Sequence, residues 1–138
     1  MELANVNWLA LIVASLAGFM LGALWYSPVL FSKLWQKEVG LSEKEANEGN
    51  MLVIFGTSFV FMLIMSLGLA LFLQFFDPAT LNFGFGALMG TLVGIFYSMT
   101  SVGINVMYQR KSMKLFLIDA GYQVLYLALV GGILAIWM

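Results

Sequence analysis

Long uncharged runs of hydrophobic residues, separated by short polar stretches, form the main pattern of this chain. No charged residue lies from Leu3 to Ser32, or from Gly49 to Phe76. Each run exceeds the ~20 apolar residues that a helix needs to cross the hydrocarbon core of a bilayer. We therefore predict one all-α membrane domain over residues 1–138, with four transmembrane helices at about 6–28, 50–76, 80–108 and 113–137.

The segment 29–48 has the pattern of an amphipathic helix that lies at the membrane surface. Its first part places hydrophobic residues on one side of a helical wheel and polar residues on the other. The apolar side contains Leu30, Phe31, Leu34 and Trp35, and the polar side contains Lys33, Gln36 and Lys37. Because indole rings and lysine side chains favour the headgroup region, we expect Trp35, Lys33 and Lys37 to anchor this helix.

Capping residues mark several of the predicted helix starts. Ser42 followed by Glu45 is a capping box, in which each side chain pairs with a free backbone N–H group. The helix that begins there is expected to run on into the second span. Asp77 before Pro78 predicts the start of the third span, and Ser112 predicts the start of the fourth.

The distribution of Lys and Arg predicts the orientation of the chain in the membrane. All six lie in or beside the first and third connections between spans, and none lies at the termini or in the second connection. Because basic loops are retained in the cytoplasm during insertion, we expect these two connections to be cytoplasmic and both termini to lie on the other side. A bias this complete predicts one fixed topology.

The composition excludes several classes of function. Hydrophobic residues make up 62% of the chain and charged residues 9%, which is incompatible with a soluble surface. A net charge of -1 without a basic face argues against nucleic-acid binding. The chain has no Cys and no His, and its ten Met residues form no cluster, so we expect no metal site, no cofactor and no enzyme activity.

Two spans carry small residues at four-residue steps, which let helix backbones approach closely in lipid. These stripes are Ala14, Gly18 and Gly22 in the first span, and Gly86, Gly90 and Gly94 in the third. Each stripe leads into a Tyr-Ser pair, so a degenerate duplication of two hairpins is one interpretation. The other is that glycine stripes and interfacial Tyr are common in membrane helices. The pattern leaves open whether the stripes pack within one chain or between copies of a homo-oligomer.

A set of polar residues is predicted to gather in the cytoplasmic half of the bundle. Asp119 is the one ionisable residue deep within a span, and Tyr122 and Gln123 share its helix face. The candidate proton or solute site consists of Asp119, Asn105, Gln123, Tyr122, Tyr26, Ser27 and Ser101.

Asp119 has two interpretations. In the first it is a structural carboxylate that accepts a hydrogen bond from Asn105, a Tyr or a Ser of another helix. In the second it is a proton or cation site, because a carboxylate inside a span is costly and commonly serves function. The positive end of the fourth helix, two turns away, offsets part of this cost.

Three sequence segments resemble a known family. The runs Asn7–Ala10 and Gly22–Pro28, followed by Phe31 and Trp35, and the run Ile118–Tyr122 are similar to the pattern of the domain of unknown function 1761 family. The resemblance covers essentially the whole chain. It implies a small four-span protein of the bacterial inner membrane and brings no established activity.

The sequence therefore leads to two main functional hypotheses. The first is a homo-oligomeric transporter or channel-like protein that handles an unknown small solute or a proton within the lipid bilayer. The second is a non-transporting scaffold that binds a partner protein. A lipid-modifying enzyme would need a second acid or a metal beside Asp119, which the sequence does not supply.

Overall fold

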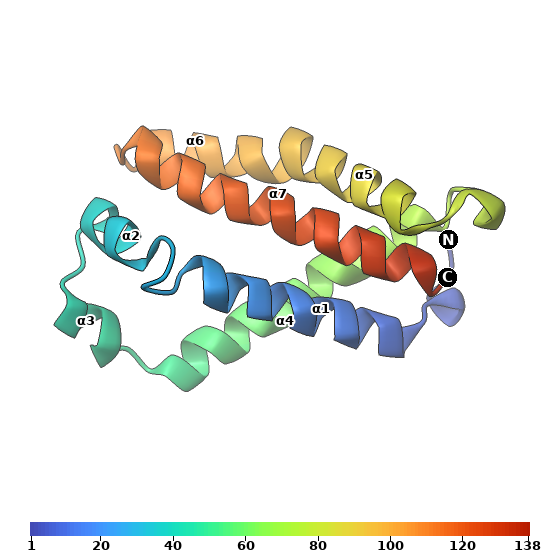
Figure 1. Cartoon of the computed structure of the whole chain (residues 1–138), viewed down its shortest axis with the longest axis horizontal. Coiled ribbons are helices and arrows are strands. Elements are labelled where there is room, and N and C mark those ends of the chain that lie inside the picture. Colours follow the sequence, from blue (N-terminus) through green and yellow to red (C-terminus); the bar gives the residue numbers. More distant parts are fainter.

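The structure is a computed structural model that describes residues 1–138, and it consists of helices without strands. Four helices are long and apolar enough to span a membrane, which confirms the predicted fold class. They run up and down in one bundle (Figure 1). Their bounds are α1 (Trp8–Trp25), α4 (Met51–Leu73), the third span Phe83–Tyr108, and α7 (Met113–Ile136).

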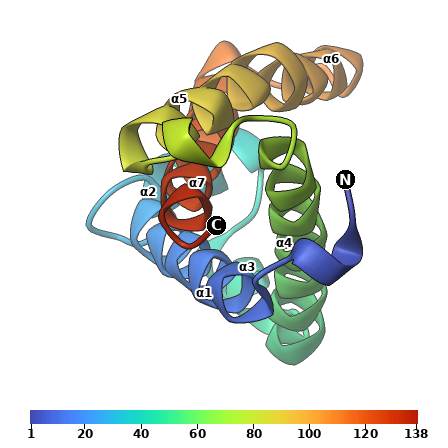
Figure 2. The ribbon, with the colours of Figure 1, turned by 90° about the vertical axis from the view of Figure 1, so that its right-hand side faces the viewer.

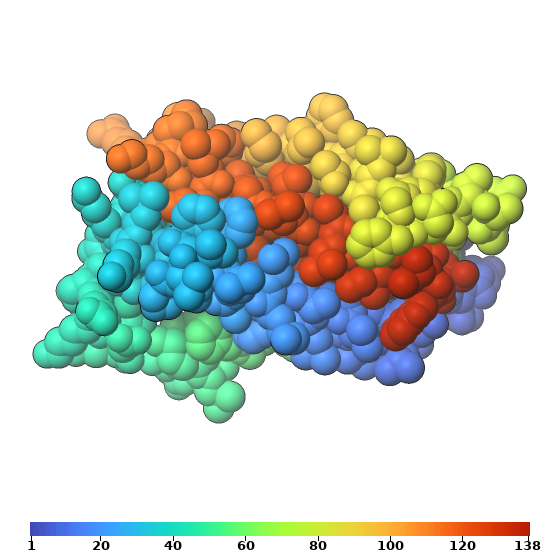
Figure 3. Space-filling model, viewed as in Figure 1, coloured from blue at the N-terminus to red at the C-terminus, as the bar shows by residue number.

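Helix α7 is the centre of the bundle. It packs against α1, α4 and the whole third span, and it lies between α1 and α5 when the bundle is viewed from one end (Figure 2). Half of the residues in the apolar 18-residue stretch of α7 are buried, compared with 11% in the corresponding stretches of α4 and the third span. The space-filling view shows α7 in red between α1 in blue and the third span in yellow and orange (Figure 3). The outer faces of the other helices are left for lipid.

The third span is not a uniform α-helix. It consists of α5 (Phe83–Val93), a π-helical turn (Gly94–Met99) and α6 (Thr100–Tyr108). A π turn inserts one extra residue into the helix and so rotates everything that follows by about 100° relative to a continuous α-helix. After this turn, the residues of α6 that face α7 are consequently Gly103, which packs against Phe116, and the buried Val106.

Side-chain caps begin all four long helices, and the structure places one start differently from the prediction. Ser112 caps α7 as predicted. Asp77 caps only the short 3-10 turn Pro78–Thr80, and α5 begins at Phe83 after a separate cap by Asn82. The third helix therefore starts a few residues later than predicted, because Pro78 begins a single turn that does not continue.

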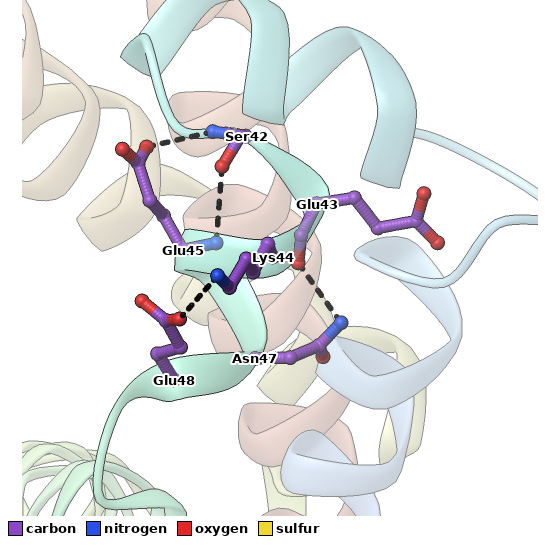
Figure 4. A network of polar contacts seen from close by, with 6 residues as sticks. All are labelled: Ser42, Glu43, Lys44, Glu45, Asn47 and Glu48. Atoms are coloured by element: carbon purple, nitrogen blue, oxygen red, sulfur yellow. Dashed lines mark hydrogen bonds and ion pairs between the residues drawn. The ribbon is translucent and has the colours of Figure 1, made fainter.

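Two short helices, α2 (Ser32–Val39) and α3 (Glu43–Glu48), connect α1 to α4. Gly40 ends α2 in the left-handed conformation, with φ of 86°. The predicted capping box is present, since Ser42 and Glu45 exchange hydrogen bonds (Figure 4). The expectation that this helix runs on into the second span is wrong, because Gly49 is extended and Asn50 caps α4 separately.

All six Lys and Arg residues lie in or beside the connections at one end of the bundle, which we call the basic end (residues 28–50 and 109–114). There Lys111 Nζ donates to the Val39 carbonyl at 3.1 Å, which ties the two connections together. Both chain termini lie at the opposite, terminal end (Figure 1). At that end Asn7 Nδ2 donates to the Trp137 carbonyl at 3.1 Å. The chain is thus an integral membrane protein with its cationic residues at one end.

Candidate functional site

The candidate site is built around Asp119, which lies on α7 near the basic end. Its carboxylate is half-buried, and Oδ1 accepts a hydrogen bond of 2.7 Å from the hydroxyl of Tyr26, the residue that ends α1. The neighbouring Trp25 donates its indole N–H to the Ile118 carbonyl at 2.9 Å. The end of α1 is therefore fixed to α7 by two adjacent hydrogen bonds, one of which uses the acid.

Aromatic rings surround the Tyr26–Asp119 pair. The Tyr26 ring meets the Trp35 ring edge-on at 5.9 Å between centroids, and the Tyr122 ring at 5.5 Å. Trp35 belongs to α2, and its indole also lies beside the Asp119 carboxylate without the geometry of a direct hydrogen bond. The sequence predicted Trp35 as an interfacial anchor. In the structure its ring lies against Tyr26 and borders the site.

A second polar group lies deeper in the bundle, at Tyr126. Ser15 donates to Ser66 at 2.8 Å, Ser66 lies 2.9 Å from the Tyr126 hydroxyl, and Tyr126 donates to the Met62 carbonyl at 2.8 Å. Since each hydroxyl has one hydrogen, these contacts form one chain from Ser15 through Ser66 to Tyr126. The sequence analysis missed both serines. The available signal was that each is an isolated hydroxyl in an otherwise apolar part of its span.

The small-residue stripe of α1 accommodates the two tyrosines of α7. A Cβ added at Gly18 would collide with the Tyr126 ring, and one added at Gly22 would lie 2.8 Å from the Tyr122 hydroxyl. Tyr122 itself donates to the Gly18 carbonyl at 3.0 Å. Ala14, the first member of the stripe, is fully buried.

The stripe of the third span packs against the other side of α7. A Cβ at Gly86 would collide with the Gly131 backbone, and one at Gly90 would collide with the Leu127 backbone. One at Gly94 would lie 2.9 Å from the Cα of Val124. Both stripes therefore make contacts within the chain, a point that the sequence left open.

The structure does not bring every predicted residue to Asp119. Ser101 and Asn105 are exposed on α6, and Gln123 is half-buried without a side-chain hydrogen bond. Ser27, just beyond the end of α1, donates to the Leu24 carbonyl at 2.6 Å. A continuous α-helix would have placed Asn105 in line with the glycine stripe and toward α7. The π turn rotates it away, so Tyr26 and not Asn105 is the partner of Asp119.

The site as a whole offers one carboxylate and a set of aromatic and hydroxyl groups. No three acidic, His or Cys side chains come together anywhere in the chain. The chemistry open to Asp119 is therefore proton exchange, hydrogen bonding or attraction of a single cation. A groove of about 510 Å³ between α4 and the third span is lined mainly by apolar side chains, and Asp119 does not contribute to it. The role of the predicted site residues remains a prediction.

Comparison with known families matches residues 9–135 to the model described as "Protein of unknown function (DUF1761)". The matched range contains the Trp25–Tyr26 corner and Asp119. No curated protein and no solved structure matches the chain.

Proposed function

Since this chain belongs to the DUF1761 family, whose description names no activity, we propose a function from the geometry around Asp119. The protein is a homo-oligomeric transporter or channel-like protein that binds a proton or a small solute in the half of the bundle nearest the basic end. It inserts with the basic end in the cytoplasm of a bacterial cell, because connections that carry all the Lys and Arg are retained there.

The observation that carries this proposal is a carboxylate inside a membrane span that is neither enclosed nor ion-paired. Asp119 is half-buried and accepts one direct hydrogen bond, from a neutral phenol. The one ion pair of the chain joins Lys44 and Glu48 within α3 and does not involve Asp119. A carboxylate without a cationic partner costs free energy inside a bilayer. Its presence there therefore favours a functional role for Asp119.

The arrangement of polar groups along α7 also supports a solute path that starts at the basic end. From Asp119 to Tyr126 the polar side chains extend over about 10 Å of the helix axis. Beyond Tyr126 the core is apolar, with Val130, Leu134 and Leu73 fully or almost fully buried. Passage across the membrane would therefore require this apolar half to open, as a gated transporter does.

The test is flux into proteoliposomes that contain purified protein. Wild-type protein should admit protons, followed with an internal pH-sensitive dye, several-fold faster than empty liposomes, and Asp119→Asn should return the rate to that background. Glu43→Gln is the matched control, because it removes an exposed acid whose side chain makes no contact at the site. If Glu43→Gln lowers the rate as much as Asp119→Asn, the assignment of the site is wrong.

The flux test also needs a defined set of ions besides protons. Sodium, potassium and tetraphenylphosphonium ions should be tried in the same liposomes, because the solute is unidentified. If wild-type protein moves none of these ions or protons above background, the transport proposal is overturned.

The second candidate is a non-transporting scaffold, which one observation favours. Every buried side-chain nitrogen or oxygen atom of the chain has a hydrogen-bond partner, as expected of a static core. In that case wild-type protein shows no flux, and Asp119→Asn only lowers the melting temperature, because Tyr26 loses its acceptor charge.

A further inference from the structure

A polar face that begins in the π turn and continues along α6 makes no side-chain hydrogen bond within the chain. Tyr97, Ser101, Asn105 and Tyr108 follow one another at steps of three or four residues, so they lie above one another on one side of the helix. All four are exposed, and Tyr97 and Tyr108 are 73% and 87% accessible. The side-chain hydrogen bonds of this stretch are made by Thr100 and Lys111 instead.

Along α6 this face points away from α7, whereas Tyr97 borders the groove between α4 and the third span. Gly103 packs against Phe116 of α7, and Val106 is buried. On a helical wheel with 100° per residue, the polar face is centred about 170° from these two residues. The π turn before α6 sets this orientation, since it turns Asn105 away from α7.

The polar face extends deep into the hydrocarbon region. If Tyr108 lies at its boundary, Asn105 is about 4 Å, Ser101 about 10 Å and Tyr97 about 16 Å further in, at 1.5 Å per residue. Tyr97 is then near the midplane of a core ~30 Å thick. Acyl chains cannot satisfy hydroxyl and amide groups at these depths, and each unpaired group carries a cost.

We propose that this face is the contact between two copies of the chain, with α6 of one copy packed along α6 of the other. The inference rests on the proposed function for the existence of an oligomer and adds the surface that forms it. Copies inserted with one orientation are related by a two-fold axis along the bilayer normal, so identical positions meet at the same depth. Asn105 then faces its own counterpart.

The chemistry of the face favours a second copy over another partner. A carboxamide is both donor and acceptor, so two Asn105 side chains satisfy each other across a two-fold axis. The face carries no charge, so it does not require a charged partner helix. The glycine stripe of the same span is already covered by α7 and is not available for the contact.

Single-cysteine cross-linking tests the proposal cleanly, because the chain contains no native Cys. Ser101→Cys and Asn105→Cys should form disulfide-linked dimers in native membranes on mild oxidation, since a disulfide needs Cα atoms within about 7 Å. Thr100→Cys and Met107→Cys are matched controls on the same helix, both exposed and about 100° around it. We expect at least a fivefold higher yield at the two face positions than at the two controls.

A second variant tests the role of the amide. Asn105→Leu should lower the cross-linking yield of Ser101→Cys several-fold, while the monomer loses no stability because the exposed Asn105 side chain makes no hydrogen bond within the chain. Equal yields at all four positions, or a maximum at Thr100 or Met107, would overturn the proposed interface. Failure here leaves the flux test of Asp119 standing, because a monomer retains that site, and loss of flux in Asp119→Asn does not alter the cross-linking pattern.

Discussion

The two small-residue stripes pack against opposite sides of α7, yet they contact different parts of that helix. Along α5 and the π turn, Gly86, Gly90 and Gly94 lie against the backbone of α7. Along α1, Gly18 and Gly22 lie against the rings of Tyr126 and Tyr122. One side is a contact between backbones, and the other is a groove that holds aromatic side chains.

The difference shows that a spacing motif does not define its own partner. Both stripes repeat every four residues, and what distinguishes them is the face that α7 presents. On one face α7 offers Gly131 and the carbonyls beside it, which permits the closest approach. On the other it offers tyrosines whose hydroxyls need acceptors, and the buried Gly18 carbonyl supplies one for Tyr122 at 3.0 Å.

The largest expected effect lies in the contact between backbones. In Gly90→Ala the new methyl group would collide with the Leu127 backbone, which cannot move without separating the two helices. Overpacking of this kind costs about 1–3 kcal/mol, and more where the backbone must shift, so we expect a loss of about 3 kcal/mol in the free energy of unfolding. Denaturation of the purified protein in mixed micelles measures it.

Gly56→Ala is the control for this variant. Gly56 lies in α4, and an added Cβ there would meet no atom within 4 Å. Its unfolding free energy should equal or slightly exceed that of the wild type, because Ala favours the helical state. An equal loss in both variants would mean that the glycines matter through helix propensity and not through packing.

The fold was predictable because its determinants are local. Run length gives the four spans, the distribution of Lys and Arg places two connections at one end, and Ser112 and the Ser42–Glu45 box mark helix starts that the structure contains. The end of α3 was not predictable in the same way, because Gly49 becomes extended between two helices that are each able to form.

The site was less predictable because it depends on a rotation that the sequence does not reveal. A period of 3.6 residues places Asn105 in line with Gly94, and one extra residue in the π turn rotates it by about 100°, away from α7. Tyr26 was among the candidates, but its pairing with Asp119 depends on where α1 ends against α7. Ser15 and Ser66 were missed because single hydroxyls in apolar spans normally bond to their own helix.

A smaller effect is expected on the aromatic side of the comparison. In Gly18→Ala the methyl group would collide with the Tyr126 ring, which can tilt only if its hydroxyl leaves Ser66 and Met62. We expect a loss of about 1–2 kcal/mol in the free energy of unfolding. In the Tyr126→Phe background the same substitution should cost less, by about 0.5–1 kcal/mol, since the ring is no longer held. Full additivity in this double-mutant cycle would show that the hydroxyl does not fix the ring.

The smallest effect compares the two Tyr-Ser pairs that follow the stripes. Tyr26→Phe removes the donor of the 2.7 Å hydrogen bond to Asp119, whereas Tyr97→Phe removes a hydroxyl that has no partner within the chain. Hydrogen bonds between transmembrane helices average about 0.6 kcal/mol and reach about 1.7, so we expect a loss of about 1 kcal/mol for Tyr26→Phe. Tyr97→Phe should leave the unfolding of the monomer unchanged, which micelle denaturation at low protein concentration measures. Equal losses in both variants would mean that the two pairs have equivalent environments, as a duplication of hairpins predicts, and that Tyr26 gains nothing from the acid. A loss confined to Tyr26→Phe would mean that similar sequence at the ends of the first and third spans has acquired separate tasks, one inside the chain and one on its surface.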